Sequence, residues 1–327
     1  MINETMTITP SPLLVQDYRL PAIIIFVIST LGLYCHCFMM LSIQRVLYQN
    51  SPYYMLVASQ SFGEAVTCAL FASYYSPMVI FNISSMKLWS NYVGLFLICC
   101  LDVVNCSHLV IAVNRLCAIC LPTKYGSYFS PRSTLVYIAV IWLFSTLPHV
   151  YFEGFLGCSL YYDDSIWGFM FEQDGVCHFV LWSLHFPKQL TTVILIAIID
   201  TITVIKVRLT SSKVAHSGAK QSIAKRNVEV NFLKQAVGQF LLWIIEMFCY
   251  FFLSGLFSST FMKWILCTFA WNVMNAGDAI LVIFLNKDVR RLFYHPSKLF
   301  VVPQIQKASS RHVTVLSRAA NTSDFMA

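Results

Sequence analysis

Seven long apolar segments run through this chain and restrict the folds open to it. Each exceeds the roughly 20 helical residues that cross a hydrocarbon core of about 30 Å. Hydrophobic residues make up 57% of the chain and charged residues 11%, against about 25% charged in soluble proteins. We therefore expect an all-α membrane protein, a seven-transmembrane helix bundle without a soluble domain. The predicted spans are 21–43, 53–81, 91–120, 133–156, 180–207, 229–256 and 263–285.

The basic residues lie mostly on one side of these spans. With the N-terminus outside, four of the 22 Lys and Arg flank the outer side: Arg19, Lys87, Lys188 and Lys263. Cytoplasmic loops carry the excess of positive charge in membrane proteins, which fixes this orientation. The net charge of +7 then belongs to the inner face. It favours contact with anionic lipid, and we expect no nucleic-acid partner.

Shorter segments on either side of the spans complete the domain plan. The first residues lack the apolar core of a cleavable signal peptide, so the first span is expected to act as a signal anchor. After the seventh span, Val289, Leu292 and Phe293 share one face of a short amphipathic helix that ends before Pro296. We predict an extracellular segment, a seven-helix domain with this helix, and a disordered cytoplasmic tail, at residues 1–20, 21–295 and 296–327.

Two chemical features fall outside the membrane in this orientation. Sequons begin at Asn3 and Asn82, which we expect to be glycosylated. Of the 12 cysteines, Cys158 and Cys177 lie in the loop between the fourth and fifth spans. We predict that they form a disulfide, worth roughly 3 kcal/mol in the chain-entropy model. Two free thiols are the alternative. No His and Cys spacing fits a closed zinc site, so no metal is expected.

Acidic side chains inside the predicted spans are candidates for function, because charge is costly in hydrocarbon. They are Glu64, Asp102, Asp200, Glu246 and Asp278. Asp200 lies near the inner end of its span, where nearby basic residues can compensate it. Four residues are candidates to line a ligand pocket: Asp102, Glu64, Trp182 and Trp271. The alternative is that the two tryptophans are core residues or interfacial anchors.

The inner end of the third span carries a recognisable run of residues. It resembles the third-helix signature of rhodopsin-like receptors, an acid-Arg-aromatic triplet followed by Ile, Pro and Tyr. Four anchor positions match: Arg115, Ile119, Pro122 and Tyr125. Asn114 replaces the acid and Leu116 the aromatic residue.

Further motifs make the resemblance more specific. They are the helix-two run 51–64, the helix-five run 198–206, the end of helix seven at 278–286 with Arg290, and the two-cysteine loop with Trp167. Together they resemble the nematode serpentine receptors of class x (Srx) over roughly residues 20–295. The resemblance implies a G-protein-coupled chemosensory receptor of the plasma membrane, including that of sensory cilia. It implies a small-molecule ligand and a heterotrimeric G protein as partners.

The resemblance also assigns roles to individual residues. For G-protein coupling it points to Asn114, Arg115, Ile119, Pro122, Tyr125 and Glu229. An Arg115–Glu229 pair would hold the inactive state; a side chain that reaches the interface without a partner is the alternative. A buried polar cluster is expected from His36, Gln60, Glu64 and Asp278. Gln60 and Glu64 stack on one helix face, four residues apart. The alternative is that each of these side chains has its own hydrogen-bond partner in the backbone or in water.

Three departures from the patterns of rhodopsin-like receptors affect these expectations. The sixth span lacks a proline between Glu229 and Leu256, so its motion needs another flexible point, for which Gly238 is a candidate. Ser90 occupies the position of the cysteine that usually joins the third helix to the outer loop. Leu97 stands where amine receptors keep an acid, so we expect no amine ligand.

Other functions remain open beside that of a receptor. The acids in the spans also suit an ion-conducting or transporting protein, although no internal repeat is visible and seven spans do not divide into equal halves. We find no metal-ligand cluster, P-loop or nucleophile elbow, so we expect neither an enzyme nor a cofactor.

The predicted orientation can be tested by labelling a tagged chain in cells. An epitope at the N-terminus should stain on intact cells, and an epitope after Ala327 only after permeabilisation. A C-terminal tag that stains intact cells would contradict the orientation.

Overall fold

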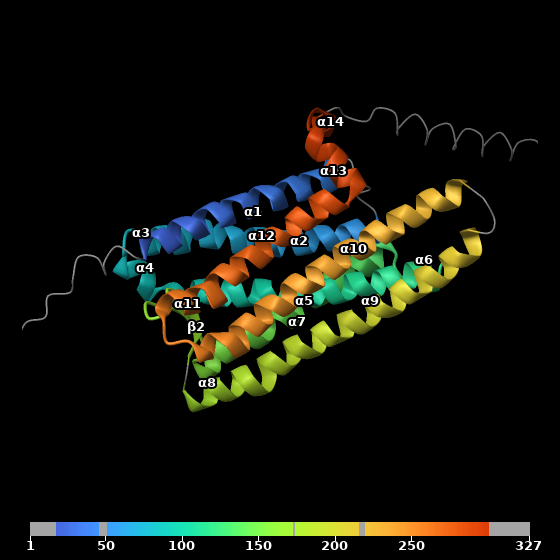
Figure 1. Cartoon of the computed structure of the whole chain (residues 1–327). Coiled ribbons are helices and arrows are strands. Elements are labelled where there is room, and N and C mark those ends of the chain that lie inside the picture. Colours follow the sequence, from blue (N-terminus) through green and yellow to red (C-terminus); the bar gives the residue numbers. More distant parts are fainter. Residues whose placement is uncertain (1–17, 46–50, 173, 216–219, 301–327) are drawn as a thin grey trace, which may run out of the picture.

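The computed structural model is a bundle of seven membrane-length helical spans (Figure 1). It describes residues 18–45, 51–172, 174–215 and 220–300. The spans match the predicted segments and confirm the fold class. They are Arg19–Arg45, Pro52–Ile80, Ser90–Cys120, Pro131–Leu156, Gly175–Leu209, Lys234–Leu256 and Thr260–Leu285.

Several spans consist of more than one helical element. Those of α-helix alone are α1 (Arg19–Arg45), α5 (Ser90–Cys120) and α7 (Pro131–Leu156). The second span comprises α2 (Pro52–Leu70), η1 (Phe71–Tyr75) and α3 (Ser76–Ile80), and the fifth comprises α8 (Gly175–Val180), η2 (Leu181–His185) and α9 (Phe186–Ala215). The sixth comprises α10 (Lys220–Phe248), η3 (Cys249–Leu253) and η4 (Ser254–Leu256), and the seventh comprises α11 (Thr260–Trp264), η5 (Ile265–Phe269) and α12 (Ala270–Leu285). Shorter helices are α4 (Ser84–Leu88), α6 (Tyr125–Tyr128), α13 (Lys287–Tyr294) and α14 (Ser297–Phe300).

A π-helical turn lies within each of the four composite spans. In the second span, η1 precedes Pro77, and the Ser76 hydroxyl donates to the carbonyl oxygen of Phe71 at 2.9 Å. Proline lacks the N–H that an α-helix needs, and the wider turn before it is one of the local adjustments that let a membrane helix continue through a proline. The span therefore continues through the interruption that the sequence shows. In the sixth span the irregular turns are η3 and η4, whereas α10 runs regularly through Gly238.

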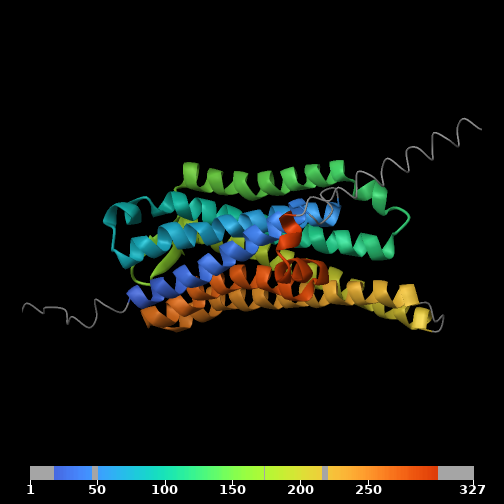
Figure 2. The same cartoon turned by 90° about the horizontal axis from the view of Figure 1, so that it is seen from above.

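The third span, α5, lies at the centre of the bundle. It packs against α2, α7 and α9, and its N-terminal part, the outer part in the predicted orientation, packs against strand β1. By contrast, α7 packs mainly on α5 and α2 and runs along one edge of the molecule (Figure 2). Many large apolar side chains of α7 are exposed, as expected for a helix that faces lipid.

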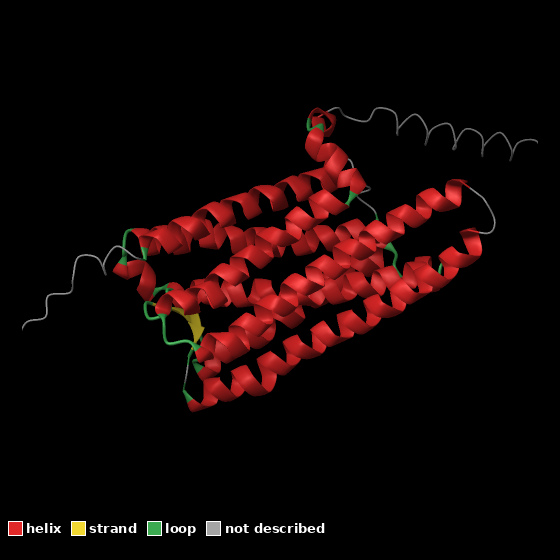
Figure 3. Ribbon diagram, in the orientation of Figure 1, coloured by secondary structure: helices red, strands yellow, loops and turns green. Residues whose placement is uncertain are grey.

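The predicted disulfide between Cys158 and Cys177 is present and joins the end of α7 to α8. Between the two cysteines the chain forms an antiparallel hairpin of β1 (Leu160–Asp163) and β2 (Gly168–Phe171), shown in yellow in Figure 3. No pattern in the sequence predicted these strands. The hairpin lies at the same end of the bundle as α3, α4 and α11 (Figure 1).

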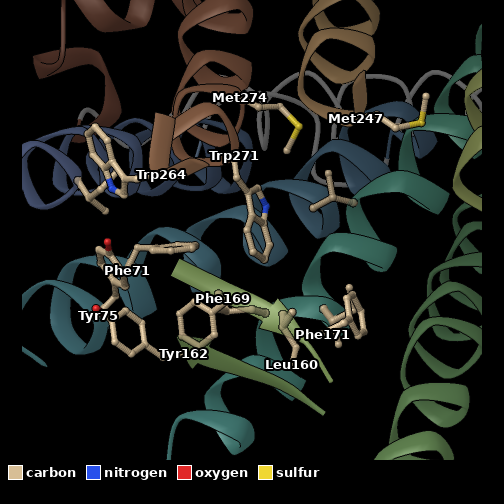
Figure 4. Close-up of a cluster of buried hydrophobic side chains, with 14 of the residues drawn as sticks. Phe71, Tyr75, Leu160, Tyr162, Phe169, Phe171, Met247, Trp264, Trp271 and Met274 are labelled. Carbon is tan, nitrogen blue, oxygen red and sulfur yellow. The ribbon is translucent and has the colours of Figure 1, made fainter. Parts of the chain in front are cut away.

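The hairpin packs into the end of the bundle rather than standing above it. Its Phe169 ring meets Phe71 edge-on at 6.0 Å between centroids, and Tyr162 and Phe169 both contact Tyr75 (Figure 4). Polar links fix the hairpin in place. The Tyr75 hydroxyl donates to the carbonyl oxygen of Trp167 at 2.6 Å, and the Tyr162 amide donates to Ser90 at 3.0 Å.

At the opposite end, the predicted amphipathic helix is present as α13. Its Val289 and Leu292 are buried against the bundle, and Phe293 meets Phe38 of α1 edge-on at 5.2 Å. The apolar face of α13 thus packs on α1 and α12. The predicted tail begins with α14, and residues 301–327 lie outside the described residues.

Gly94 of α5 is where the hairpin approaches a helix most closely. A Cβ atom there would overlap the carbonyl group of Leu160, whereas a Cβ on Gly154 of α7 would meet nothing within 4 Å. We expect Gly94→Ala to lower stability by about 1–3 kcal/mol, because strand β1 must shift. Gly154→Ala is the matched control and should be neutral or slightly stabilising.

Melting temperatures of the purified variants in mild detergent measure both effects. Equal melting temperatures for the Gly94→Ala and Gly154→Ala variants would contradict the close packing of β1 on α5.

Candidate functional site

An ion pair joins α5 and α9 near the C-terminal ends of their spans, which are the inner ends in the predicted orientation. One guanidinium nitrogen of Arg115, Nη2, lies 3.0 Å from Oδ1 and 3.3 Å from Oδ2 of Asp200. The two side chains are 11% and 9% exposed. A charge-assisted hydrogen bond of this kind is strong, and removing either partner would leave a buried charge uncompensated. The pair therefore links the neighbouring third and fifth spans.

Asp200 is the acid that contacts Arg115 in the described part of the chain. The side chain of Glu229, on α10, lies outside the described residues, so the Arg115–Glu229 pair stays a prediction. The sequence feature that could have indicated Asp200 is its distance from the C-terminal end of its span. Arg115 lies five residues before the end of α5, and Asp200 lies nine before the end of its span at Leu209, so the two fall at similar heights.

The rest of the signature links α5 to the loop that follows it. Asn114 donates from Nδ2 to the Tyr125 hydroxyl at 3.1 Å, and the Tyr125 ring stacks on Phe129 at 5.7 Å. An amide in place of the usual acid therefore finds a partner within the same motif. Ile119 is half-buried in the last turn of α5, and Pro122 is exposed just beyond its end.

The predicted buried polar cluster lies between α1, α2 and α12. Gln60 donates from Nε2 to Asp278 Oδ2 at 2.6 Å and approaches Glu64 Oε1 at 3.4 Å. His36 lies with Nδ1 3.3 Å from Glu64 Oε2, and its Nε2 is 3.0 Å from the carbonyl oxygen of Asn275. The structure thus brings together the four side chains that the sequence analysis grouped.

The cluster has a fifth member, His108 of α5, that the sequence analysis did not include. Its Nε2 lies 3.1 Å from Gln60 Nε2 and 4.0 Å from Asp278 Oδ2. His108 lies seven residues before Arg115, two turns up the same face of α5. That spacing was the sequence feature that could have indicated His108 as a member of the cluster. Through His108 the cluster reaches the central helix of the bundle.

Two small cavities lie beside this cluster and beside the Arg115–Asp200 ion pair. One is lined by His36, Gln60 and Asp278, and the other by His108, Arg115 and Asp200. Gln239 of α10 lines both. Trp243, on the next turn of α10, lines the second cavity and meets His108 edge-on at 6.3 Å. Gln239 and Trp243 of α10 therefore lie beside both the cluster and the ion pair.

The four candidates for a ligand pocket lie in different surroundings. Asp102 binds His149 and Lys188, and Glu64 belongs to the buried polar cluster. Trp271 is buried against Phe71, next to the hairpin (Figure 4). Trp182 is 39% exposed and packs on Phe186 and Phe251. None of the four lines either of the two cavities described above. Aromatic side chains of the hairpin lie beside Trp271 in the same apolar cluster.

The predicted glycosylation sites lie apart from these clusters. Asn82 is exposed between α3 and α4, at the same end as the hairpin, and it adopts a left-handed conformation with φ of 52°. Asn3 lies outside the described residues. Glycosylation at both asparagines stays a prediction.

Comparison with known proteins decides the family. The family described as serpentine type 7TM GPCR chemoreceptor Srx matches this chain over residues 26–286. The chain belongs to the Srx family. Serpentine receptor class X 45 of Caenorhabditis elegans is 26% identical over 311 residues, 90% of this chain and 86% of that protein. Serpentine receptor class X-43 of the same organism is 25% identical over 310 residues, 94% of each chain.

Srx membership confirms the resemblance seen in the sequence motifs. It supports a chemosensory GPCR role and places the chain in a class of receptors rather than of enzymes. Together with the seven spans, it makes the chain a multi-pass membrane protein. The rhodopsin-like signature at the C-terminal end of the third span is the region where Arg115 binds Asp200.

The buried polar cluster yields a stability prediction. Gln60→Leu removes the donor to Asp278 and leaves a buried carboxylate poorly satisfied, so we expect a loss of about 1–3 kcal/mol. In the double variant Gln60→Leu/Asp278→Leu both partners are apolar, and the loss should be less than the sum of the single losses.

The melting temperature in mild detergent is the measurement. Ser73→Ala, which alters an exposed side chain bonded within its own helix, serves as the control with little expected effect. Strictly additive losses in the double variant would show that Gln60 and Asp278 are energetically independent.

Proposed function

We propose that this Srx receptor binds a small molecule within the helix bundle and signals to a heterotrimeric G protein at the plasma membrane. Signalling proceeds through the inner ends of the third, fifth and sixth spans, which are α5, α9 and α10. The observation that carries the proposal is the Arg115–Asp200 ion pair. It joins two of these spans, and the third lines the cavity beside it.

The free energy of this pair is of the right size for a switch. Removing one partner of a buried ion pair costs about 3–5 kcal/mol because the other charge is left uncompensated, and this is the upper limit for separating the two partners. Moving a two-state equilibrium from 1:99 to 99:1 takes about 5.5 kcal/mol. Gain or loss of one such contact therefore shifts most of the population. In the inactive state Asp200 holds the guanidinium, and in the active state Arg115 is free to meet the G protein.

The outer half of the bundle supports a ligand that is small and mostly apolar. The side chains around the hairpin include Phe71, Phe169, Trp271 and Met274, all buried. Leu97 is 1% exposed at the position where amine receptors keep an acid. An apolar or weakly polar odorant-like molecule suits these surroundings, whereas a cationic amine finds no acid at that position.

Asp200→Asn tests the coupling role of the ion pair. Loss of the carboxylate releases Arg115, so basal second-messenger signalling should rise at least about threefold, since a gain of that size needs less than 1 kcal/mol. Arg115→Ala should abolish ligand-evoked signalling at unchanged surface level. The assay is a second-messenger reporter in cells that express each variant, screened with small odorants.

Glu172→Gln, which removes a carboxylate near the hairpin, is the matched control and should behave as wild type. Evoked signalling that survives Arg115→Ala would contradict the coupling role. Ligand-evoked current in bilayers free of G protein would instead favour the ion-conducting alternative.

A further inference from the structure

A second cluster of ionisable side chains lies between α5, α7 and the start of α9, apart from the site described above. It contains Asp102 of α5, His149 of α7 and His185, the last residue of η2. The three are 1%, 6% and 5% exposed. One ligand atom from each lies within 4.8 Å of the others. Two imidazoles and a carboxylate thus converge at a buried point about 18 Å below the outer end of α5.

Asp102 carries spare acceptor capacity at this point. His149 Nε2 lies 2.6 Å from Oδ2, and the ammonium of Lys188 donates to the same oxygen. The other carboxylate oxygen, Oδ1, is buried without a hydrogen-bond partner. A buried anionic oxygen without a partner is unfavourable, so this atom is available to a further cation or donor.

His185 is held in the manner of a metal ligand. Its Nε2 lies 3.1 Å from the Gln189 amide, which also contacts Asn105 at 3.2 Å. Its Nδ1 is buried without a partner. A half-turn of both amides exchanges nitrogen and oxygen without moving the chain. Gln189 then accepts from Nε2–H, and the lone pair of Nδ1 is free. A metal-bound histidine usually donates its other N–H to such an acceptor.

From this geometry we propose that Asp102, His149 and His185 form a Zn²⁺ site, which Lys188 neutralises in the metal-free receptor. Two histidines and one carboxylate are a known zinc set with an open fourth position. Ligand atoms of a tetrahedral zinc are about 3.4 Å apart. The cluster needs adjustments of little more than 1 Å to close. Ca²⁺ and Mg²⁺ require mostly oxygen ligands and fit poorly.

Lys188 allows Asp102 to exchange an ammonium group for a metal ion. Its side chain is 27% exposed, so the ammonium can leave Asp102 and reach a more polar region. Zn²⁺ then takes its place, and the histidines bind through unprotonated nitrogens. The ion would tie α7, which packs mainly on two neighbours, to α5 and α9. The three ligands lie 47 and 36 residues apart in the sequence, so no short spacing indicated a metal.

The test uses the full-length receptor, purified in lipid nanodiscs and stripped with a chelator. Zn²⁺ is titrated against a chromophoric chelator, and Co²⁺ absorption reports the ligand geometry. We expect one site with a dissociation constant below about 100 µM. His149→Ala and His185→Ala should each weaken binding by at least about tenfold. Lys188→Met should tighten it by at least about tenfold, because the competing ammonium is gone.

Two variants serve as controls. His178→Ala removes an exposed histidine of α8 near the same end, and His108→Asn alters the separate group of Glu64, His108 and Asp278. Neither should change the affinity by more than about twofold. Size-exclusion profiles report whether each variant is folded, and Lys188→Met keeps the test valid because a misfolded receptor would not gain affinity.

The proposal is overturned if the wild-type receptor binds no Zn²⁺ below about 100 µM. It is also overturned if Lys188→Met leaves affinity unchanged, or if either control variant abolishes binding.

Discussion

The pairing of buried charges across helices is the constraint on which this structure depends. A lone ion inside the bundle is unfavourable, so an ionised acid needs a donor or a cation close by. Four of the five acids in the spans have one, whereas no partner of Glu246 is seen among the described residues. Asp200 has Arg115, Asp278 has Gln60, and Glu64 accepts from Gln60 through Oε1, with His36 Nδ1 3.3 Å from its other oxygen. Asp102 has both His149 and Lys188. All of these contacts except Gln60–Glu64 join different spans. The positions of the charged side chains therefore constrain how the helices pack.

The central helix α5 collects these contacts at three depths. Asp102, His108 and Arg115 follow one another at intervals of six and seven residues, about 10 Å apart. The helix α9 meets it twice, through Lys188 at the outer level and Asp200 at the inner level. The two ion pairs have opposite polarity, since α5 supplies the acid outside and the base inside. A displacement of α9 along α5 would therefore disturb both pairs together, which couples the outer half of the bundle to its inner face.

Much of this architecture follows from local features of the sequence. Hydropathy predicted the seven spans, because each needs enough apolar residues to cross the bilayer. Exclusion of the other cysteines from the outer loop predicted the Cys158–Cys177 disulfide. The four-residue spacing of Gln60 and Glu64 indicated a shared face of one helix. In the structure Asp278 and His36, from two other helices, lie against that face. The hairpin was missed because its strands are four residues each, too short for a periodicity to be visible.

The sequence by itself determined how many helices there are, the apolar length of each, the acids within them and the Srx motifs. These are properties of single segments, set by the cost of placing backbone and charge in hydrocarbon. Only the tertiary structure decided the partners: Asp200 for Arg115, His108 in the polar cluster, His149 and His185 beside Asp102, and a hairpin in the outer end of the bundle. Those contacts depend on how neighbouring helices are rotated and on their relative height, which long-range packing sets and no local pattern records.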